Sequence, residues 1–179
     1  MDPFEVRDSL ESLTVLVDTR EQDTPAFRRR MKALGCPYRR EKLDSGDYSA
    51  VCTLPGGMEY SLANEVVIER KMALDEACQN FTRGRERFIR EFDRLRERGG
   101  KAYLLIENAG WEDVFSGNYR SRFHPNALVA SLKAWEARYD THILFCPAKL
   151  TGQMIYKTLY YELKERLESG AADELCTGN

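Results

Sequence analysis

The stretch VVIERKMALD, residues 66–75, decides how the chain folds and where its chemistry lies. Three β-branched apolar residues in a row predict a strand that is buried on both faces. This strand runs directly into Glu69, Arg70 and Lys71, and a further carboxylate follows at Asp75. Two interpretations are open: the charges form a solvated strand end, or they are a catalytic carboxylate and lysine held on a rigid strand.

The composition is that of an ordinary but heavily charged globular protein. The 179 residues are 42% hydrophobic and 31% charged, with a formal net charge of −2, and this length favours one domain. No apolar run reaches membrane-spanning length, and the N-terminus lacks the pattern of a secretory signal. The five scattered cysteines favour free thiols in a reducing cytoplasm, and two histidines argue against a zinc site.

Hydrophobic periodicity predicts an α/β domain. Apolar runs predict strands over 13–18, 38–43, 47–54, 58–63, 64–71, 102–108 and 142–146. Helical spacing predicts helices between Pro25 and Gly35, before Gly99, over 125–139 and over 149–168. The order predicts a central mixed β-sheet with an antiparallel meander, flanked by helices. We expect a polar N-terminal extension at 1–12, one domain at 13–168 and a flexible C-terminal tail at 169–179.

Carboxylates stand at the ends of three predicted strands, at Asp18, Asp47 and Glu69. Because residues two apart in a strand share a face, Glu69 and Lys71 point to the same side and Arg70 points to the other. We therefore expect the three carboxylates to lie close together, with Lys71 beside them.

Closely packed carboxylates repel one another and lose hydration, so they need a compensating cation. Carboxylate, carbonyl and water oxygens suit a hard ion such as Mg²⁺ or Mn²⁺. Such an ion lowers the pKa of a bound water and neutralises charge on a scissile phosphate, while a lysine can orient the nucleophile. The residues therefore favour a metal-dependent phosphodiesterase site.

Three motifs resemble the XPF-type structure-specific nuclease family, whose core pattern is GD, a spacer and ERKxxxD. They are VDTRE (17–21), SGDY (45–48) and IERKMALD (68–75). That family belongs to the restriction-endonuclease-like superfamily, named for its Asp…(Asp/Glu)-x-Lys site, and the similarity runs from about residue 13 to residue 166. The resemblance implies a restriction-endonuclease-like core.

Two features depart from the family pattern. Glu91 stands where several members carry glutamine, which adds an acid near the site. Members with junction specificity carry helicase or tandem helix-hairpin-helix domains, and neither is found in this sequence. We expect a stand-alone nuclease module of the kind found in bacterial or phage replication and repair.

The resemblance assigns roles to the charged residues of the motifs. The catalytic residues that it implies are Arg20, Asp47, Glu69, Lys71 and Asp75. The metal ligands that it implies are Asp18, directly or through water, Asp47, Glu69 and the backbone carbonyl of Arg70. Lys71 would position or activate the attacking water, and Arg20 would hold the carboxylates or the phosphate. Asp75 would support the site, or it is an ordinary first-turn acid that is favourable against a helix dipole.

A run of arginines and a stretch rich in aromatic residues surround the motifs. The candidate DNA-binding residues are Arg83, Arg85, Arg87 and Arg90. Neighbouring acids at Glu86, Glu91 and Asp93 could instead pair with them at helical spacing. The aromatic residues of GWEDVFSGNYRSRF (110–123) could stack on bases, but we expect them to anchor a long loop on the core. His124 precedes a proline and is expected to cap a helix or to pack.

The final predicted helix has a broad apolar face. Core packing explains part of it, and the resemblance implies a homodimer formed by the C-terminal half of the domain. The candidate interface residues are Ile155, Tyr156, Leu159, Tyr160 and Leu163.

The sequence favours a DNA endonuclease that depends on Mg²⁺, for which Mn²⁺ can substitute, and that uses no nucleotide cofactor. The resemblance implies branched DNA as the substrate, in repair, recombination or replication. One alternative is an exonuclease or Holliday-junction resolvase of the same fold. The other is a non-catalytic DNA-binding scaffold subunit, which has no need to keep an acid cluster charged.

Overall fold

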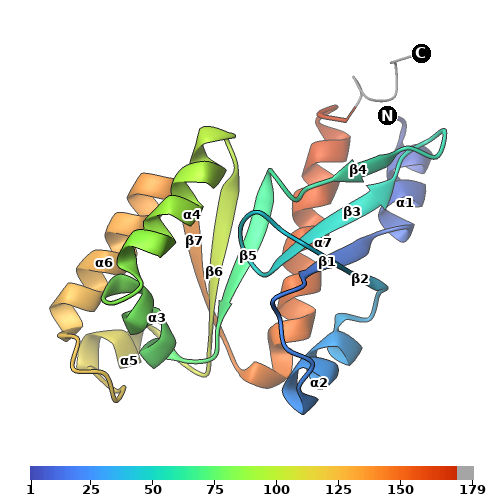
Figure 1. Ribbon diagram of the computed structural model, residues 1–179. Coiled ribbons are helices and arrows are strands. Elements are labelled where there is room, and N and C mark those ends of the chain that lie inside the picture. Colours follow the sequence, from blue (N-terminus) through green and yellow to red (C-terminus); the bar gives the residue numbers. More distant parts are fainter. Residues whose placement is uncertain (173–179) are drawn as a thin grey trace.

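A mixed seven-stranded sheet runs through the middle of the computed structural model, which describes residues 1–172 (Figure 1). Its strands are β1 (Thr14–Asp18), β2 (Tyr38–Glu41), β3 (Tyr48–Thr53), β4 (Glu59–Ser61), β5 (Val66–Lys71), β6 (Lys101–Glu107) and β7 (Thr141–Cys146). The order is β2-β1-β3-β5-β6-β7, and β4 lies beside β3. β3 is antiparallel to its neighbours, and the other pairs are parallel. The predicted α/β fold with a mixed sheet is confirmed.

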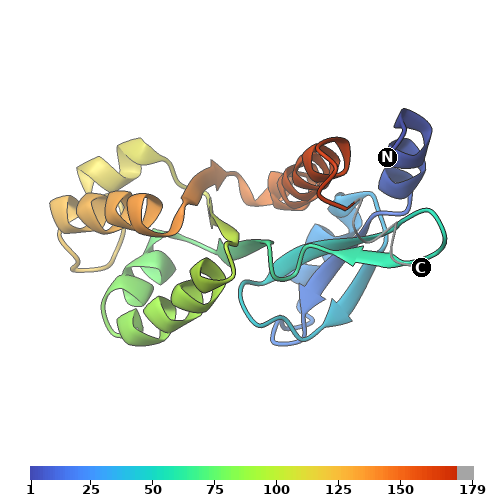
Figure 2. The ribbon, with the colours of Figure 1, turned by 90° about the horizontal axis from the view of Figure 1, so that it is seen from above.

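The helices form two groups (Figures 1 and 2). One group comprises α1 (Pro3–Glu11), α2 (Pro25–Leu34) and α7 (Thr151–Glu168), which follows the short 3-10 helix η1 (Ala148–Leu150). The other comprises α3 (Leu74–Phe81), α4 (Arg85–Glu97), α5 (Trp111–Ser116) and α6 (Pro125–Tyr139). Each group builds its own hydrophobic core against the sheet.

Alternation along β5 explains its unbroken Val-Val-Ile run. Val66 and Ile68 join the core that includes α7, whereas Val67 joins the core built by α3, α4 and α6. Both faces of the strand are therefore covered, which is why neither face carries polar residues here. Continued alternation places Glu69 and Lys71 on the Val67 face.

Prolines and capping side chains fix the helix starts that the sequence predicted. Thr24 accepts a hydrogen bond from the Phe27 N–H and caps α2, and His124 accepts one from the Asn126 N–H and caps α6. The prediction for His124 is confirmed. Gly35, with φ of 73°, ends α2 in the left-handed conformation that glycine adopts most easily.

Residues 1–12, expected as a polar extension, contain helix α1. Asp2 and Glu5 form a capping box at its start. Val6 and Leu10, four residues apart, are buried in the core beside α7. These residues are therefore part of the folded domain.

The stretch at 110–123, expected as a loop, begins with the short helix α5. Trp111, Tyr119 and Phe123 pack against the core of α3, α4 and α6, as we predicted for aromatic anchors. Phe115 is the exception and is largely exposed.

The apolar face of α7 lies inside the domain, which corrects the predicted dimer interface. Ile155, Leu159 and Leu163 have 0% exposure and pack in the core with α1, α2 and the sheet. They are not available to a second copy of the chain. Tyr156 and Tyr160 are only partly buried at the edge of this core.

The C-terminal tail predicted at 169–179 lies mostly outside the described residues. Within them, Ala172 is buried against the core that includes α7. In the described part of the chain, no helix is long and apolar enough to cross a membrane.

Candidate active site

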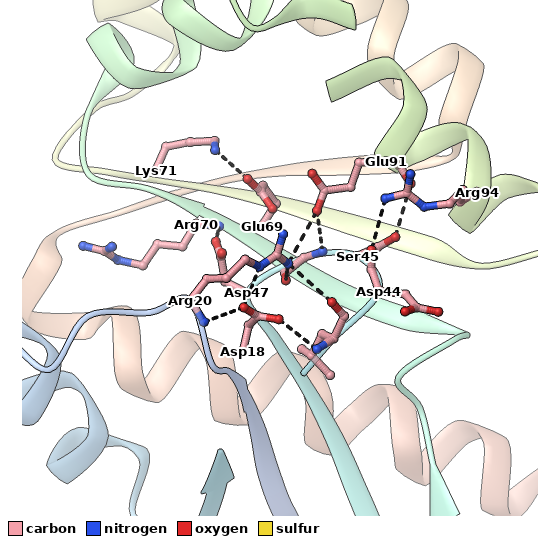
Figure 3. Close-up of polar contacts among 12 residues, drawn as sticks. Asp18, Arg20, Asp44, Ser45, Asp47, Glu69, Arg70, Lys71, Glu91 and Arg94 are labelled. Atoms are coloured by element: carbon pink, nitrogen blue, oxygen red, sulfur yellow. Dashed lines mark hydrogen bonds and ion pairs between the residues drawn. The ribbon is translucent and has the colours of Figure 1, made fainter. Parts of the chain in front are cut away.

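Three carboxylates form a row across β1, β3 and β5. β3 is antiparallel to both neighbours, and both registers pass through Tyr48. Asp18 and Glu69 directly follow the paired residues Val17 and Ile68, and Asp47 directly precedes Tyr48, so the three carboxylates come together at this end of the strands (Figure 3). The Asp47 carbonyl accepts a hydrogen bond from the Asp18 N–H, and the Asp47 N–H donates one to the Ile68 carbonyl, each at 2.9 Å. Like charges on adjacent strands destabilise a sheet when their side chains are neighbours. The strands therefore bring together the carboxylates that the sequence predicted would meet, and each needs compensation.

Both carboxylate oxygens of Asp18 have protein partners. Its Oδ1 accepts hydrogen bonds from the backbone N and Nε of Arg20 at 2.7 and 2.6 Å, and its Oδ2 accepts one from the Leu43 N–H at 2.8 Å. Burial alone would raise the pKa of this carboxyl, but the hydrogen bonds outweigh burial and lower the pKa. Asp18 therefore holds Arg20 and Leu43 in place, while Oδ2, which accepts a single hydrogen bond, keeps a lone pair. The role of Asp18 as a direct or water-mediated metal ligand stays a prediction.

Asp47 and Glu69 are less well compensated. The Arg70 N–H, 2.8 Å from Oδ2, is the hydrogen-bond donor to the Asp47 carboxylate among the described residues. Burial, and then the charge of Glu69, raises the pKa of Asp47 well above its usual range. Burial also raises the pKa of Glu69, and the charge of Glu91 adds to this effect. The positive charge of Lys71 lowers both pKa values but does not offset burial and the neighbouring negative charges.

Lys71 supplies the cation nearest to Glu69. Its Nζ donates a hydrogen bond to Glu69 Oε1 at 2.5 Å and lies 5.4 Å from the centroid of the Phe88 ring. Burial would lower the pKa of the ammonium, but the charge and hydrogen bond of Glu69 outweigh it, so the pKa is raised. Contact with Glu69 thus favours the ammonium form of Lys71, which can orient a water or stabilise negative charge.

Glu91 ties α4 to the turn that carries Asp47. Its Oε1 accepts a hydrogen bond from the Gly46 N–H at 3.2 Å, and its backbone oxygen accepts one from the Ser45 hydroxyl (Figure 3). Arg20 Nη2 lies 3.9 Å from the same carboxylate. The acid that departs from the family pattern thus fixes the geometry of the turn.

Arg70 points to the opposite face of the sheet. Its Nε and Nη2 donate hydrogen bonds to the two oxygens of Glu107 at 2.9 and 3.0 Å. The Thr151 hydroxyl, at the start of α7, donates a further hydrogen bond to Glu107. The side chain of Arg70 is therefore structural, and its backbone contacts the carboxylate row.

A cleft of about 1220 Å³ opens beside Glu69 and Lys71. Its walls come from α3, the start of α4 and the loop before α6, and the arginines lining it are Arg83, Arg87, Arg120 and Arg122. Of the predicted DNA-binding residues, Arg83 and Arg87 line the cleft, whereas Arg85 and Arg90 do not. Arg90 instead lies 4.0 Å from Glu86, one helical turn away, as the alternative interpretation allowed.

Sequence reasoning missed two arginines of the cleft and the contact that orders them. Arg120 and Arg122 lie in the aromatic-rich stretch 110–123, for which the prediction considered only the aromatic residues. The two arginines of the sequence RSR were a signal for a basic surface. Asp75 also lines the cleft, and its carboxylate accepts hydrogen bonds from the N–H groups of Arg120 and Ser121.

The donor set at the centre of the row fits a hard cation. Within residues 1–172, no group of three or more His, Cys, Asp or Glu side chains is arranged to hold a metal ion. Mg²⁺, however, commonly binds through one or two carboxylates and keeps several waters. Asp47 and Glu69 offer two such carboxylates, and their mutual repulsion favours a cation between them.

Comparisons with known proteins agree with this fold. The chain is similar to XPF from Aeropyrum pernix, with 22% identity and a TM-score of 0.57, over 82% of this chain and 65% of that chain. It is also similar to XPF from Aeropyrum pernix in complex with DNA, with 24% identity and a TM-score of 0.58, over 86% of this chain and 66% of that chain. The chain thus spans just under two thirds of the length of these structures. A comparison with curated proteins found no match.

A sequence model of the ERCC4 domain matches residues 17–158. The match begins one residue before Asp18 and includes Asp47, Glu69 and Lys71, so it covers the whole carboxylate row. Since it also covers well over half of the 179 residues, the chain belongs to the ERCC4 domain family.

Proposed function

We propose that this protein is a DNA endonuclease that depends on a divalent metal ion. The observation that carries the proposal is the pair of carboxylates, Asp47 and Glu69, whose burial is not offset by positive charge, beside the Lys71 ammonium in the wall of an arginine-lined cleft. Membership of the ERCC4 domain family and similarity to an XPF that was solved with DNA support a DNA nuclease.

Asp47 and Glu69 would hold Mg²⁺, for which Mn²⁺ can substitute, and the backbone carbonyl of Arg70 would be a further ligand. When bound, such an ion lowers the pKa of a coordinated water and neutralises charge on the scissile phosphate. Lys71, fixed by Glu69, orients the attacking water and stabilises the negative charge that develops on the phosphate. Arg20 neutralises Asp18 and reaches toward the carbonyl of Gly46, which keeps the turn before Asp47 in place.

Branched DNA, such as forks, flaps or junctions, is the substrate class that we propose, in repair, recombination or replication. Support comes from the motifs VDTRE, SGDY and IERKMALD, which resemble the XPF-type pattern. We place the protein in a reducing cytoplasm, which the free thiols of Cys36, Cys78 and Cys146 support.

We also propose a homodimer, but through a surface other than the buried face of α7. Tyr156 and Tyr160 lie at the edge of that helix, and Tyr161 is 54% exposed. Sedimentation velocity at micromolar concentration should give the mass of a dimer. A monomer under these conditions would contradict the proposal.

A non-catalytic DNA-binding subunit is the second candidate. The observation that favours it is that, among residues 1–172, no group of three or more His, Cys, Asp or Glu side chains is arranged to hold a metal ion. Such a subunit would bind DNA through its arginines and would need no metal.

Cleavage of end-labelled linear, flapped, forked and four-way DNA tests the proposal. Reactions with Mg²⁺, Mn²⁺ or EDTA would compare the wild type with Asp47→Asn and Glu69→Gln, and Glu112→Gln, an exposed acid outside the cleft, is the matched control. We expect metal-dependent cutting that both site variants lose and the control keeps, with branched DNA cut first. DNA binding without cutting, and without calorimetric Mn²⁺ binding that depends on Asp47, would favour the second candidate.

A further inference from the structure

The Asp75 carboxylate ties helix α3 to the loop between α5 and α6. We name residues 118–123 the arginine loop. Oδ1 of Asp75 accepts hydrogen bonds from two consecutive backbone N–H groups of this loop, Arg120 at 3.0 Å and Ser121 at 2.8 Å. Oδ2 lies 3.7 Å from Arg120 Nε. The Asp75 carboxylate therefore fixes the backbone of the loop and also lies close to the guanidinium of Arg120.

The other contacts of the arginine loop hold its ends and its inner side. The Tyr119 hydroxyl donates to the Phe123 carbonyl at 2.9 Å, and both rings pack against the core. The Ser121 side chain interacts with the Cys78 thiol of α3. Backbone hydrogen bonds to Asp113 and Gly117 hold the start of the loop, and the Phe123 N–H donates to the Ser121 hydroxyl. Between them, Asp75 accepts from the N–H groups of Arg120 and Ser121 and so ties the middle of the loop to α3.

The arginine loop carries two guanidinium groups into the wall of the cleft. Arg120 and Arg122 line it together with Arg83 and Arg87, which come from the start of α4 and the turn before it. The Arg120 side chain is 93% exposed, so its guanidinium is open to a ligand. The volume of about 1220 Å³ exceeds what small-molecule pockets usually need. Arginines from two segments around such a cleft suit a polymer with regularly spaced phosphates.

We infer that Asp75 is a positioning residue, which holds the arginine loop so that Arg120 and Arg122 bind the phosphodiester backbone of a DNA strand leading to Lys71. The inference rests on the proposed function and adds to it a set of phosphate contacts. It gives Asp75 a mechanical role, through backbone N–H groups, in place of a role in metal binding or catalysis.

The chemistry of the contact separates these roles. A backbone N–H needs an acceptor oxygen, and the amide of asparagine offers one in nearly the same place as a carboxylate. A metal ion or a charged partner is held far less strongly by the neutral amide of asparagine than by a carboxylate. Asp75→Asn should therefore keep the loop in place, whereas Asp75→Ala leaves the N–H groups of Arg120 and Ser121 without their partner.

Hydrogen exchange of the DNA-free protein tests the positioning role. We expect the amides of Arg120 and Ser121 to exchange at least several-fold faster in Asp75→Ala than in the wild type, and Asp75→Asn to stay close to the wild type. Asp23→Ala, which removes an exposed aspartate paired with Arg28, is the matched control and should leave these amides unchanged. Equal protection in all variants would overturn the positioning role.

Fluorescence anisotropy with labelled forked DNA in EDTA tests the phosphate contacts. The double variant Arg120→Ala/Arg122→Ala should bind roughly tenfold more weakly, and the slope of log K against log salt should fall by about 2, because two phosphate contacts are lost. Arg96→Ala/Arg138→Ala removes the same charge from exposed positions outside the cleft and should bind nearly as the wild type. Asp75→Ala should weaken binding, and Asp75→Asn should restore it.

The outcomes distinguish this inference from the proposed function. Binding that is unchanged in the arginine double variant, by a protein that still cuts DNA, would overturn the phosphate contacts and leave the nuclease in place. Loss of binding in Asp75→Asn as large as in Asp75→Ala would show that charge is what matters and would overturn the positioning role. A wild type that binds but does not cut would overturn the endonuclease, while exchange and anisotropy would still decide the role of the loop.

Discussion

Arg70 and Lys71 are neighbours on β5, but their side chains lie on opposite faces of the sheet. We name Lys71 with Glu69 the cleft pair, and Arg70 with Glu107 the core pair. The two pairs are almost equally buried, with side-chain exposures of 7% and 10% in the cleft pair and 9% and 6% in the core pair. Burial therefore does not explain how they differ.

The difference lies in how well each charge is balanced. In the core pair a guanidinium meets one carboxylate through two hydrogen bonds, and the Thr151 hydroxyl adds a third. In the cleft pair one ammonium faces the carboxylate of Glu69 and the charge of Asp47 as well. Strand alternation thus places the ion pair with a full set of hydrogen bonds on the face of β5 that packs against α7. It places the pair with excess negative charge on the face that lines the cleft.

The largest effect should come from breaking the cleft pair at its cation. Lys71→Met should lower the cleavage rate about 10³-fold, because the group that orients water and stabilises phosphate charge is lost. The free energy of unfolding should change by only about 1 kcal/mol, because Glu69, whose pKa is already raised, can take up a proton. Single-turnover cleavage and urea unfolding in EDTA would measure both, and retained cleavage would refute the role of Lys71.

Breaking the core pair should have the opposite effect, with a large loss of stability. Arg70→Met leaves the Glu107 carboxylate buried without its partner, so the free energy of unfolding should fall by about 3 kcal/mol. For a chain of this size that corresponds to a melting temperature roughly 6–12 °C lower. Thermal unfolding in EDTA is the measurement.

The double variant Arg70→Met/Glu107→Leu is the control for that prediction. Replacing both members of a buried pair by apolar side chains removes the unpaired charge, so most of the lost stability should return. A double variant as unstable as Arg70→Met alone would mean that the arginine stabilises through packing, and the contrast with the cleft pair would lose its electrostatic basis.

Asp47→Asn should stabilise the metal-free protein while removing activity. Because the folded state raises the pKa of Asp47, the folded protein holds an extra proton between the ordinary carboxyl pKa of about 4 and that raised value. Wild-type stability should therefore increase as the pH falls from 7 toward 5. The neutral variant lacks this dependence and should be more stable by about 1 kcal/mol at pH 7, with a smaller difference at pH 5. Melting temperatures at both pH values in EDTA would test this, and equal stability at pH 7 would contradict it.

Local patterns in the sequence were sufficient to predict the carboxylate row. The period of two residues separates Glu69 and Lys71 from Arg70, and strand ends carry Asp18 and Asp47, so the row follows once the strands are paired. The motifs did not reveal that both oxygens of Asp18 accept hydrogen bonds, because its partner Leu43 is 25 residues away and contributes only a backbone N–H. Almost any residue can donate a backbone N–H, so such a contact cannot be recognised from the amino-acid types in the sequence.

Patterns along α7 and in the arginine loop do not predict the observed contacts, for a similar reason. An apolar stripe at Ile155 and Leu159 is the same whether it meets its own sheet or a second chain, and only the three-dimensional packing decides. Arg120 and Arg122 reach the cleft through a loop whose course depends on Asp75, 45 residues earlier. No periodicity relates these positions.

The smallest effect that we predict separates arginines of the cleft from those beside it. Arg87→Ala should weaken DNA binding about threefold, because the side chain lines the cleft and one phosphate contact would be lost. Arg85→Ala, two residues away on the same helix but outside the cleft, should change binding less than twofold. Anisotropy at two salt concentrations would compare them, and the salt slope should fall by about 1 only for Arg87→Ala. Equal effects would mean that DNA responds to the net charge of α4 rather than to the cleft. In that case the cleft would contain only the catalytic residues, and the DNA-binding surface would have to extend along the exposed side of α4.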